Sequence, residues 1–281
     1  MKNNEFPESI EIEPSNIAKQ IIEIAEQTGQ LLMGVFKGQL STSYKNSDQF
    51  DPVTSADTAA DDLIRKLLTE KFPGDLILSE ENSDIPTDYS KRIWMVDPLD
   101  GTKDFIKGKD SFGIHIGLLE KGEIVFGLVF EPAQNRMFYA EKNKGSYEKK
   151  GDIFTRIHVN NTDSISDARL ITRSPGPDMR PLDSAVELLL AKERIHDSGI
   201  KVCRIACGEV EAHLNTNYRA SKWDTLAPQI ILEEAGGIMT DIDGKPLNYE
   251  QSEQRWERSY IAANNIEILN QILETVKRTG L

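Results

Sequence analysis

Two short apolar runs, each followed directly by acidic residues, constrain this chain more than any other feature. The first run, DLIL, leads into SEE at residues 79–81, and the second, RIWMV, leads into DPLD at residues 97–100. Short apolar runs bounded in this way predict buried strands. In α/β proteins, sites form beyond the carboxyl ends of such strands. The pattern therefore predicts an α/β fold with an acidic site at one edge of a sheet.

Helical periodicity surrounds these strands in the first half of the chain. Apolar residues recur at helical spacing over residues 15–36 and again from about residue 57 to residue 72, where a Pro-Gly pair ends the pattern. The polar residues 38–57 between the two helices predict a loop. A Lys-Gly turn between alternating apolar runs predicts a β-hairpin over residues 112–130, followed by a short strand, MFYA.

A polar, irregular stretch over residues 145–167 predicts the boundary between two halves, residues 1–150 and 151–281. The predicted elements of the second half are a strand over residues 168–174, a helix over 181–193, a turn at 197–199, a cysteine-bearing helix, a helix that Gly236-Gly237 ends, and a last helix over 264–277. Helices therefore cover sheets in both halves, which predicts an α/β (α+β) fold in layers.

Composition narrows the classes of partner. The chain has 46 acidic and 33 basic residues in 281, a net charge of -13. Nucleic-acid polymers and anionic membranes both need a positive footprint, so neither is expected as a partner. No apolar stretch reaches the ~20 residues of a membrane span, and the polar N-terminal residues have no signal-peptide core. We expect a cytoplasmic protein.

The two cysteines and four histidines form no metal-binding motif. Cys203 and Cys207 share a helical face beside apolar neighbours, and no matching Cys or His pair follows, which favours core packing. The histidines are scattered along the chain, and no catalytic role is assigned to them. They are His115, His158, His196 and His213.

The peptide DPLDGT at residues 97–102 carries the most chemistry. Asp97 and Asp100 end a buried strand and should repel each other unless a cation lies between them. Oxygen ligands without a thiol favour magnesium over zinc. Gly101 permits close approach of a ligand, and the amides of Gly101 and Thr102 suit a phosphate. An Asp-rich surface turn is the alternative, because DP and DG are common in turns, and the peptide alone leaves both open.

Three other acidic positions follow the same pattern. Glu80 ends the preceding strand, while Asp57 and Asp224 each stand near the start of a predicted helix. Each of these two aspartates has a simple alternative role as a helix cap. Considered singly, each position is more often structural than catalytic.

Taken together and in this order, the motifs resemble the inositol-monophosphatase-like, lithium-sensitive phosphatases. They are DPVTSAD, LSEE, WMVDPLDGT and WDTLAPQIILEEAGG, and the resemblance spans nearly the whole chain. Residues 94–132 are most similar to bacterial 3′(2′),5′-bisphosphate nucleotidases of the CysQ type. Three details carry this: KDFI after DPLDGT, Ser79 before the acidic pair, and TRS at the end of a later strand.

The resemblance implies an αβαβα sandwich and a set of residue roles. Two or three Mg²⁺ ions would be held by Glu80, Asp97, the carbonyl of Leu99, Asp100 as a bridging ligand, and Asp224. Asp57 and Thr102 would orient and deprotonate the attacking water. The phosphate and the rest of the substrate would be bound by Gly101, Thr102, Ser198, Lys201 and Arg219.

One departure bears on the substrate. Inositol phosphatases of this kind carry Glu seven residues before the aspartate of the Trp-Asp motif, and here that position is Asn217. The basic residues Lys201 and Arg219 instead suggest a ligand with a second phosphate. The leading hypothesis is therefore a phosphomonoesterase that converts 3′(2′)-phosphoadenosine 5′-phosphate to AMP and phosphate through a metal-activated water.

Two alternatives stay open. One keeps the fold and changes the substrate to an inositol phosphate or a sugar bisphosphate. The other is a catalytically silent regulator that binds metal or nucleotide. The expected partner is a small-molecule phosphate ester, and a homodimer is left open.

Overall fold

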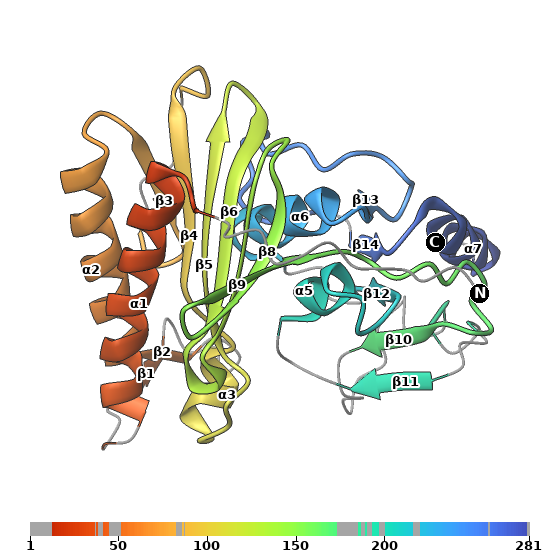
Figure 1. The fold of residues 1–281 in the computed structure, drawn as a ribbon, viewed down its shortest axis with the longest axis horizontal. Helices are drawn as coiled ribbons and strands as arrows, with labels where there is room; N and C mark the ends of the chain where they lie inside the picture. Colours follow the sequence, from red (N-terminus) through yellow and green to blue (C-terminus); the bar gives the residue numbers. More distant parts are fainter. Residues whose placement is uncertain are drawn as a thin grey trace.

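Helices and sheets alternate in five layers across the molecule (Figure 1). In the computed structural model, the described residues are 13–36, 38, 42–44, 52–82, 86, 88–172, 185–186, 189, 193–196, 200–215, 220–257 and 259–279. The layers are the pair α1 and α2, a seven-stranded sheet, the pair α5 and α6, a five-stranded sheet, and α7. The predicted αβαβα arrangement is confirmed.

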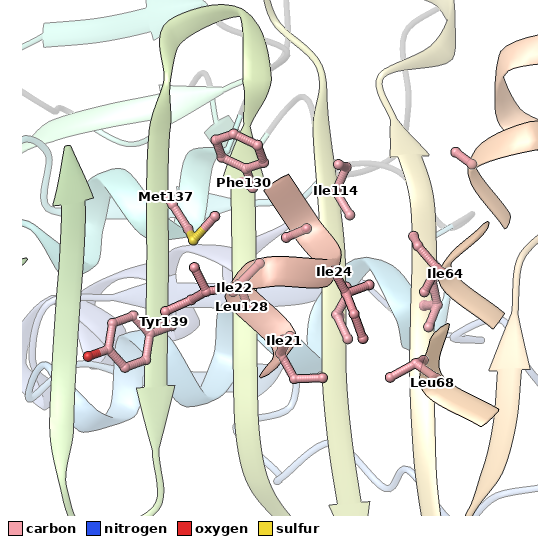
Figure 2. Packing of buried hydrophobic residues seen from close by; sticks show 14 of the residues in the cluster. Ile21, Ile22, Ile24, Ile64, Leu68, Ile114, Leu128, Phe130, Met137 and Tyr139 are labelled. Atoms are coloured by element: carbon pink, nitrogen blue, oxygen red, sulfur yellow. The ribbon is translucent and has the colours of Figure 1, made fainter. Parts of the chain in front are cut away.

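The first layer consists of the two helices expected from their periodicity, α1 (Asn16–Phe36) and α2 (Ser55–Lys71). Their apolar faces pack on the seven-stranded sheet, as Figure 2 shows for Ile21, Ile24 and Leu68. At Gly29 of α1 a methyl group would lie 2.5 Å from the ring of Phe130. A larger residue there would push the helix off the sheet.

The loop expected between these helices is wrong for two of its segments. Strands β1 (Thr42–Tyr44) and β2 (Pro52–Thr54) pair antiparallel as a separate two-stranded sheet. Pairing between backbone groups makes these strands, and the polar sequence around them gives no period-2 signal for it.

The seven-stranded sheet runs in sequence order from β3 to β9. Its strands are β3 (Leu76–Ser79), β4 (Arg92–Asp100), β5 (Gly113–Glu120), β6 (Glu123–Glu131), β7 (Arg136–Glu141), β8 (Gly145–Lys150) and β9 (Ile153–Ile157). Only β3 and β4 pair in parallel, and every other neighbouring pair is antiparallel. A short helix, α3 (Thr102–Ile106), follows β4, and the 3-10 turn η1 (Pro132–Gln134) follows β6.

The hairpin expected over residues 112–130 is confirmed by β5 and β6. The expectation of irregular structure over residues 145–167 is wrong for β8 and β9, which lie at one end of the sheet. Most side chains of these two strands are at least partly exposed. β8 carries mainly polar residues, and in the five-residue β9 polar and apolar residues do not alternate, so neither shows a clear strand pattern. The division at residue 150 stays a prediction, with β9 beyond it and paired to β8.

Helix α6 (Lys222–Glu234) occupies the middle layer between the two sheets, with α5 (Lys201–Ala206) beside it. Its close approach to the long sheet depends on glycine. At Gly117 of β5 a methyl group would lie 2.2 Å from Leu226, and at Gly127 of β6 it would lie 2.7 Å from the carbonyl oxygen of Ala227. These glycines set the depth at which α6 lies on the sheet.

The five-stranded sheet has the order β11-β10-β12-β14-β13. Its strands are β10 (Arg169–Thr172), β11 (Glu193–His196), β12 (Ala212–Leu214), β13 (Ile238–Asp241) and β14 (Tyr260–Ala263). The expected strand over 168–174 corresponds to β10, and the expected last helix to α7 (Ile266–Arg278), which covers this sheet. Most of the helix expected over 181–193 and all of the turn at 197–199 lie outside the described residues.

The cysteines lie in the core, as expected. Cys203 is fully buried on α5, and Cys207 is partly buried just after it. Burial raises the pKa of both thiols, that of Cys207 to about 11, so they stay protonated near neutral pH. Across the described ranges, no helix combines the length and the apolar character that a membrane crossing requires.

Candidate active site

The parallel pairing of β3 with β4 brings two acidic segments to one edge of the sheet. Ser79 lies opposite Val96, and the amide of Glu80 donates to the carbonyl of Val96 at 3.2 Å. Parallel strands end at the same edge, so Glu80 stands beside Asp97. The sequence predicted that the acidic residues after both apolar runs lie at one edge of a sheet, and this register brings them there.

A bulge in β4 aligns the two aspartates of the DPLD peptide. Asp97 lies opposite His115, and Asp100 lies opposite Gly113. The two aspartates are three residues apart on β4, whereas their partners are two residues apart on β5, so β4 has one extra residue here. In a regular strand, residues three apart point to opposite faces. The extra residue of a bulge removes that alternation. It brings both carboxylates toward the same face.

Gly101 turns the chain from β4 into α3. Its φ of 84° lies in the left-handed region, and a methyl group there would lie 2.7 Å from the carbonyl oxygen of Ser111. Both constraints require glycine. This turn places Thr102 at the first position of α3, directly after the bulged aspartates.

Helix α6 supplies a third acidic element from the other side of the site. Asp224 stands in its first turn, and one of its oxygens, Oδ2, accepts the amide hydrogen of Ser221 at 2.7 Å. Asp224 therefore does help to cap α6, as the alternative predicted. The same hydrogen bond orients its carboxylate, so the capping role is compatible with a role in the site. One ligand oxygen from each of Glu80, Asp97 and Asp224 lies within 4.8 Å of the other two.

The electrostatics of this trio favour a cation. Desolvation, followed by the charges of Glu80 and Asp100, raises the pKa of Asp97 well above its usual range. Desolvation and the charge of Asp100 raise the pKa of Asp224 to about 7. Gathering these anions is unfavourable without a compensating charge. Three carboxylates at this spacing fit a divalent metal with oxygen ligands, and they could hold one.

Asp100 lies next to the trio and faces His115. Its charge raises the pKa of Asp97 and Asp224, and its Oδ2 lies 3.7 Å from Nε2 of His115. His115 is buried, and desolvation lowers its pKa. The sequence assigned no role to this histidine. Its position opposite Asp97 in the strand register was the signal that could have been used.

Asp57 and Thr102, the pair predicted to orient and deprotonate the attacking water, lie close together with a long contact between them. Asp57 is buried in the first turn of α2, and Thr102 Oγ1 lies 3.4 Å from its Oδ1. The same hydroxyl lies 3.0 Å from the carbonyl oxygen of Leu99. A hydroxyl has one hydrogen, so it donates to one of these two oxygens at a time.

A buried carboxylate one turn further along α2 supports the acidic edge. Asp61 accepts a short hydrogen bond from the hydroxyl of Ser79, the residue before Glu80. Desolvation raises the pKa of Asp61. The helical spacing from Asp57 to Asp61 was visible in the sequence, but the contact with Ser79 depends on how α2 packs against the sheet.

A second wall of the site comes from α5 and the five-stranded sheet. Lys201 is the first residue of α5, and its charge lowers the pKa of both His115 and His213. Tyr260 stacks edge-on against His213, and desolvation together with the charges of Asp224 and Asp100 raises its pKa. The other two residues expected to contact substrate, Ser198 and Arg219, lie outside the described residues.

Lys222 belongs to the scaffold. It is fully buried, and its Nζ donates to the hydroxyl of Tyr89 at 3.0 Å and to the carbonyl of Gln251. Desolvation lowers the pKa of Lys222 to about 8. These contacts tie the start of α6 to two loops, so this lysine supports the helix that carries Asp224.

Comparison with known proteins identifies this arrangement. The profile of the Inositol monophosphatase family matches residues 13–279. The chain belongs to the inositol monophosphatase family. The resemblance carried by the four sequence motifs is therefore confirmed, and the chain is a phosphatase of this family.

Relatives within the family carry different names at similar identity. The 3′(2′),5′-bisphosphate nucleotidase CysQ of Salmonella typhimurium is 32% identical over 84% of this chain and 94% of its own length. A protein of Thermotoga maritima named fructose-1,6-bisphosphatase/inositol-1-monophosphatase is 28% identical over 91% of this chain and 96% of its own length.

The fold agrees with solved structures of the family. A Thermotoga maritima IMPase has a TM-score of 0.81 and 27% identity, and the match covers 95% of this chain and 98% of that one. The layered α/β architecture is thus shared over almost the full length of both chains.

Proposed function

We propose that this protein is a magnesium-dependent phosphomonoesterase that hydrolyses 3′(2′)-phosphoadenosine 5′-phosphate to AMP and phosphate. The observation that carries the proposal is a cationic group beside the acidic edge. A methyl group added at Gly113 would lie 3.6 Å from Cγ2 of Ile200, the residue before Lys201. Gly113 itself lies opposite Asp100 in the strand register. The start of α5 is therefore held against the strand that faces the carboxylates. A substrate phosphate at the metal site would leave Lys201 to contact a second anionic group.

In this proposal, two or three Mg²⁺ ions would be held by Glu80, Asp97, Asp100, Asp224 and the carbonyl of Leu99. When bound, magnesium would neutralise phosphate charge and lower the pKa of water near the phosphorus. The remaining chemistry belongs to the chain.

Asp57 is the proton acceptor, because its carboxylate is buried and within reach of Thr102. The Thr102 hydroxyl orients the attacking water by accepting its hydrogen while donating its own to Asp57. The amides of Gly101 and Thr102 bind phosphate oxygens at the turn after β4. Ser198 and Arg219 stay predictions for contact with the substrate.

The predicted cytoplasmic location also stays a prediction. Cell fractionation would test it.

A second candidate is hydrolysis of an inositol phosphate or sugar bisphosphate. The Thermotoga maritima relative with both activities in its name is almost as similar as the nucleotidase relatives. A silent regulator is not favoured, because the acidic residues needed for turnover are gathered in one place.

A phosphate-release panel tests the substrate. The purified protein with Mg²⁺ is given 3′-phosphoadenosine 5′-phosphate, inositol 1-phosphate and fructose 1,6-bisphosphate. We expect kcat/KM to favour the nucleotide by at least about tenfold, which is ~1.4 kcal/mol in the transition state. Equal or inverted efficiencies would select the second candidate, and no release from any substrate would favour the regulator.

A further inference from the structure

His115 is a buried histidine whose two ring nitrogens, Nδ1 and Nε2, both lack a hydrogen-bond partner. The residue is 4% exposed. A buried polar group without a partner is unfavourable, so such a group in a folded protein calls for an explanation. The other buried histidine of the described chain, His213, differs in this respect, because its Nδ1 lies 2.8 Å from the carbonyl oxygen of Ile171.

The imidazole stands between two elements that carry carboxylates. His115 lies on β5 opposite Asp97, and its Nε2 faces Asp100 Oδ2 at 3.7 Å. That separation is too long for a hydrogen bond. On the α6 side, backbone groups of Trp223 and Asp224 act on the ring without meeting hydrogen-bond geometry. Carboxylate and backbone groups therefore face the ring from both elements, and the charge of Lys201 also acts on it.

The tautomer decides which side is served. A neutral imidazole has one N–H and one lone pair. Because the groups on both sides accept hydrogen, a single N–H can satisfy only one of them. When Nδ1 carries the N–H, Nε2 presents its lone pair to a carboxylate oxygen. Two electron-rich atoms that face each other at 3.7 Å are stabilised by a cation between them.

The distance suits one ion. Ordinary Zn–N and Zn–O bonds add up to about 4.2 Å, so a single ion can reach two ligand atoms 3.7 Å apart. We propose that His115 Nε2 and Asp100 Oδ2 share a divalent cation, and that this nitrogen donor makes their position selective for first-row transition metals. Imidazole suits zinc and its neighbours, whereas carboxylate and carbonyl oxygens suit magnesium.

The consequence is a site with two kinds of position. Glu80, Asp97 and Asp224 form an all-oxygen position. Asp100 and His115 form a mixed nitrogen and oxygen position beside it. Zinc, cobalt or manganese should therefore bind at the second position in the presence of magnesium at the first. This inference rests on the metal centre of the proposed function and is independent of the proposed substrate.

The test measures metal binding without substrate. Metal-free protein is titrated with Zn²⁺, Co²⁺ and Mg²⁺ by calorimetry, for the wild type, His115→Gln, His115→Asn and the control His158→Asn. His158 is an exposed histidine, so the control reports adventitious binding. We expect both His115 variants to lose Zn²⁺ and Co²⁺ affinity by at least about tenfold, with Mg²⁺ affinity within about twofold. Equal Zn²⁺ affinities in all four proteins would overturn the proposal.

A second measurement does not depend on how the His115 variants fold, because it uses only the wild type and the control. In protein labelled with ¹⁵N-histidine, Zn²⁺ should shift the ring nitrogens of one buried histidine, and the shift should persist in His158→Asn. Unshifted resonances for His115 would also overturn the proposal. If the wild type bound no Mg²⁺ at all, the proposed metal centre would fail instead, and that result is distinct from a failure of His115.

Discussion

The acidic edge and the wall opposite it are built in different ways. The acidic edge is made of residues just after β3, at the end of β4 and in the first turns of α2 and α6, and some are oriented by short-range contacts such as the Ser221 amide on Asp224. The wall consists of Lys201, His213 and Tyr260, which come from α5, β12 and β14. The first region is defined by local peptides and the second by the packing of a separate sheet.

The difference suggests a division of roles. In the proposed function, the acidic edge has the carboxylates that would bind metal and activate water. The wall has a cation at Lys201, with a buried imidazole and a phenol beside it. Relatives with different substrates in their names match this chain along most of its length. We therefore expect changes at the edge to affect turnover and changes at the wall to affect selectivity.

The largest effect is expected at the acidic edge. Asp57→Asn should lower kcat by about 10²-fold or more, because it removes the proposed base. Its Mg²⁺ affinity should stay close to that of the wild type. Asp100→Asn is the matched variant, and it should weaken Mg²⁺ binding as well as turnover. Steady-state kinetics and calorimetry separate the two outcomes, and near-normal turnover in Asp57→Asn would refute the assigned role.

The second effect concerns the stability of the edge without metal. The pKa of Asp224 is raised to about 7 from 3.8, so the folded state binds more protons than the unfolded state between these values. Stability should then fall as pH rises from 4 to 7. For Asp224, the loss between pH 5 and pH 8 is on the order of 2–3 kcal/mol, or roughly 5–10 °C in Tm.

Thermal melting of the metal-free protein at the two pH values measures this loss. Mg²⁺ should restore stability at pH 8 and have little effect at pH 5, where protons compete for the same carboxylates. Asp224→Asn should flatten the pH dependence. A metal-free protein equally stable at both pH values would show that the carboxylates are not crowded as described.

The smallest effect is expected at the wall. Lys201→Met should raise KM for the bisphosphate nucleotide by about tenfold, since it removes one charge-assisted contact of ~1.4 kcal/mol. Its kcat should change little. Lys245→Met, at an exposed lysine in the turn after β13, is the control. If the Lys201 variant lost kcat and kept KM, the division between edge and wall would be wrong.

Several elements were predictable because their signals are local. The periodicity of α1 and α2 and the turn between β5 and β6 each depend on neighbouring residues. The acidic ends of β3 and β4 were visible in the same way. Strands β8 and β9 were missed, because β8 is mainly polar and the short β9 lacks regular alternation of polar and apolar residues.

The sequence by itself determined the donors of the site: four carboxylates, a turn glycine and the Asp57–Thr102 pair, all within short recognisable peptides. Only the tertiary structure decided how they face each other. The β4 bulge turned Asp97 and Asp100 to one side, and β5 placed His115 beside Asp100. Packing of α5 brought Lys201 to the opposite wall. Side-chain identity is local, whereas strand register and layer packing depend on contacts between residues far apart in the chain.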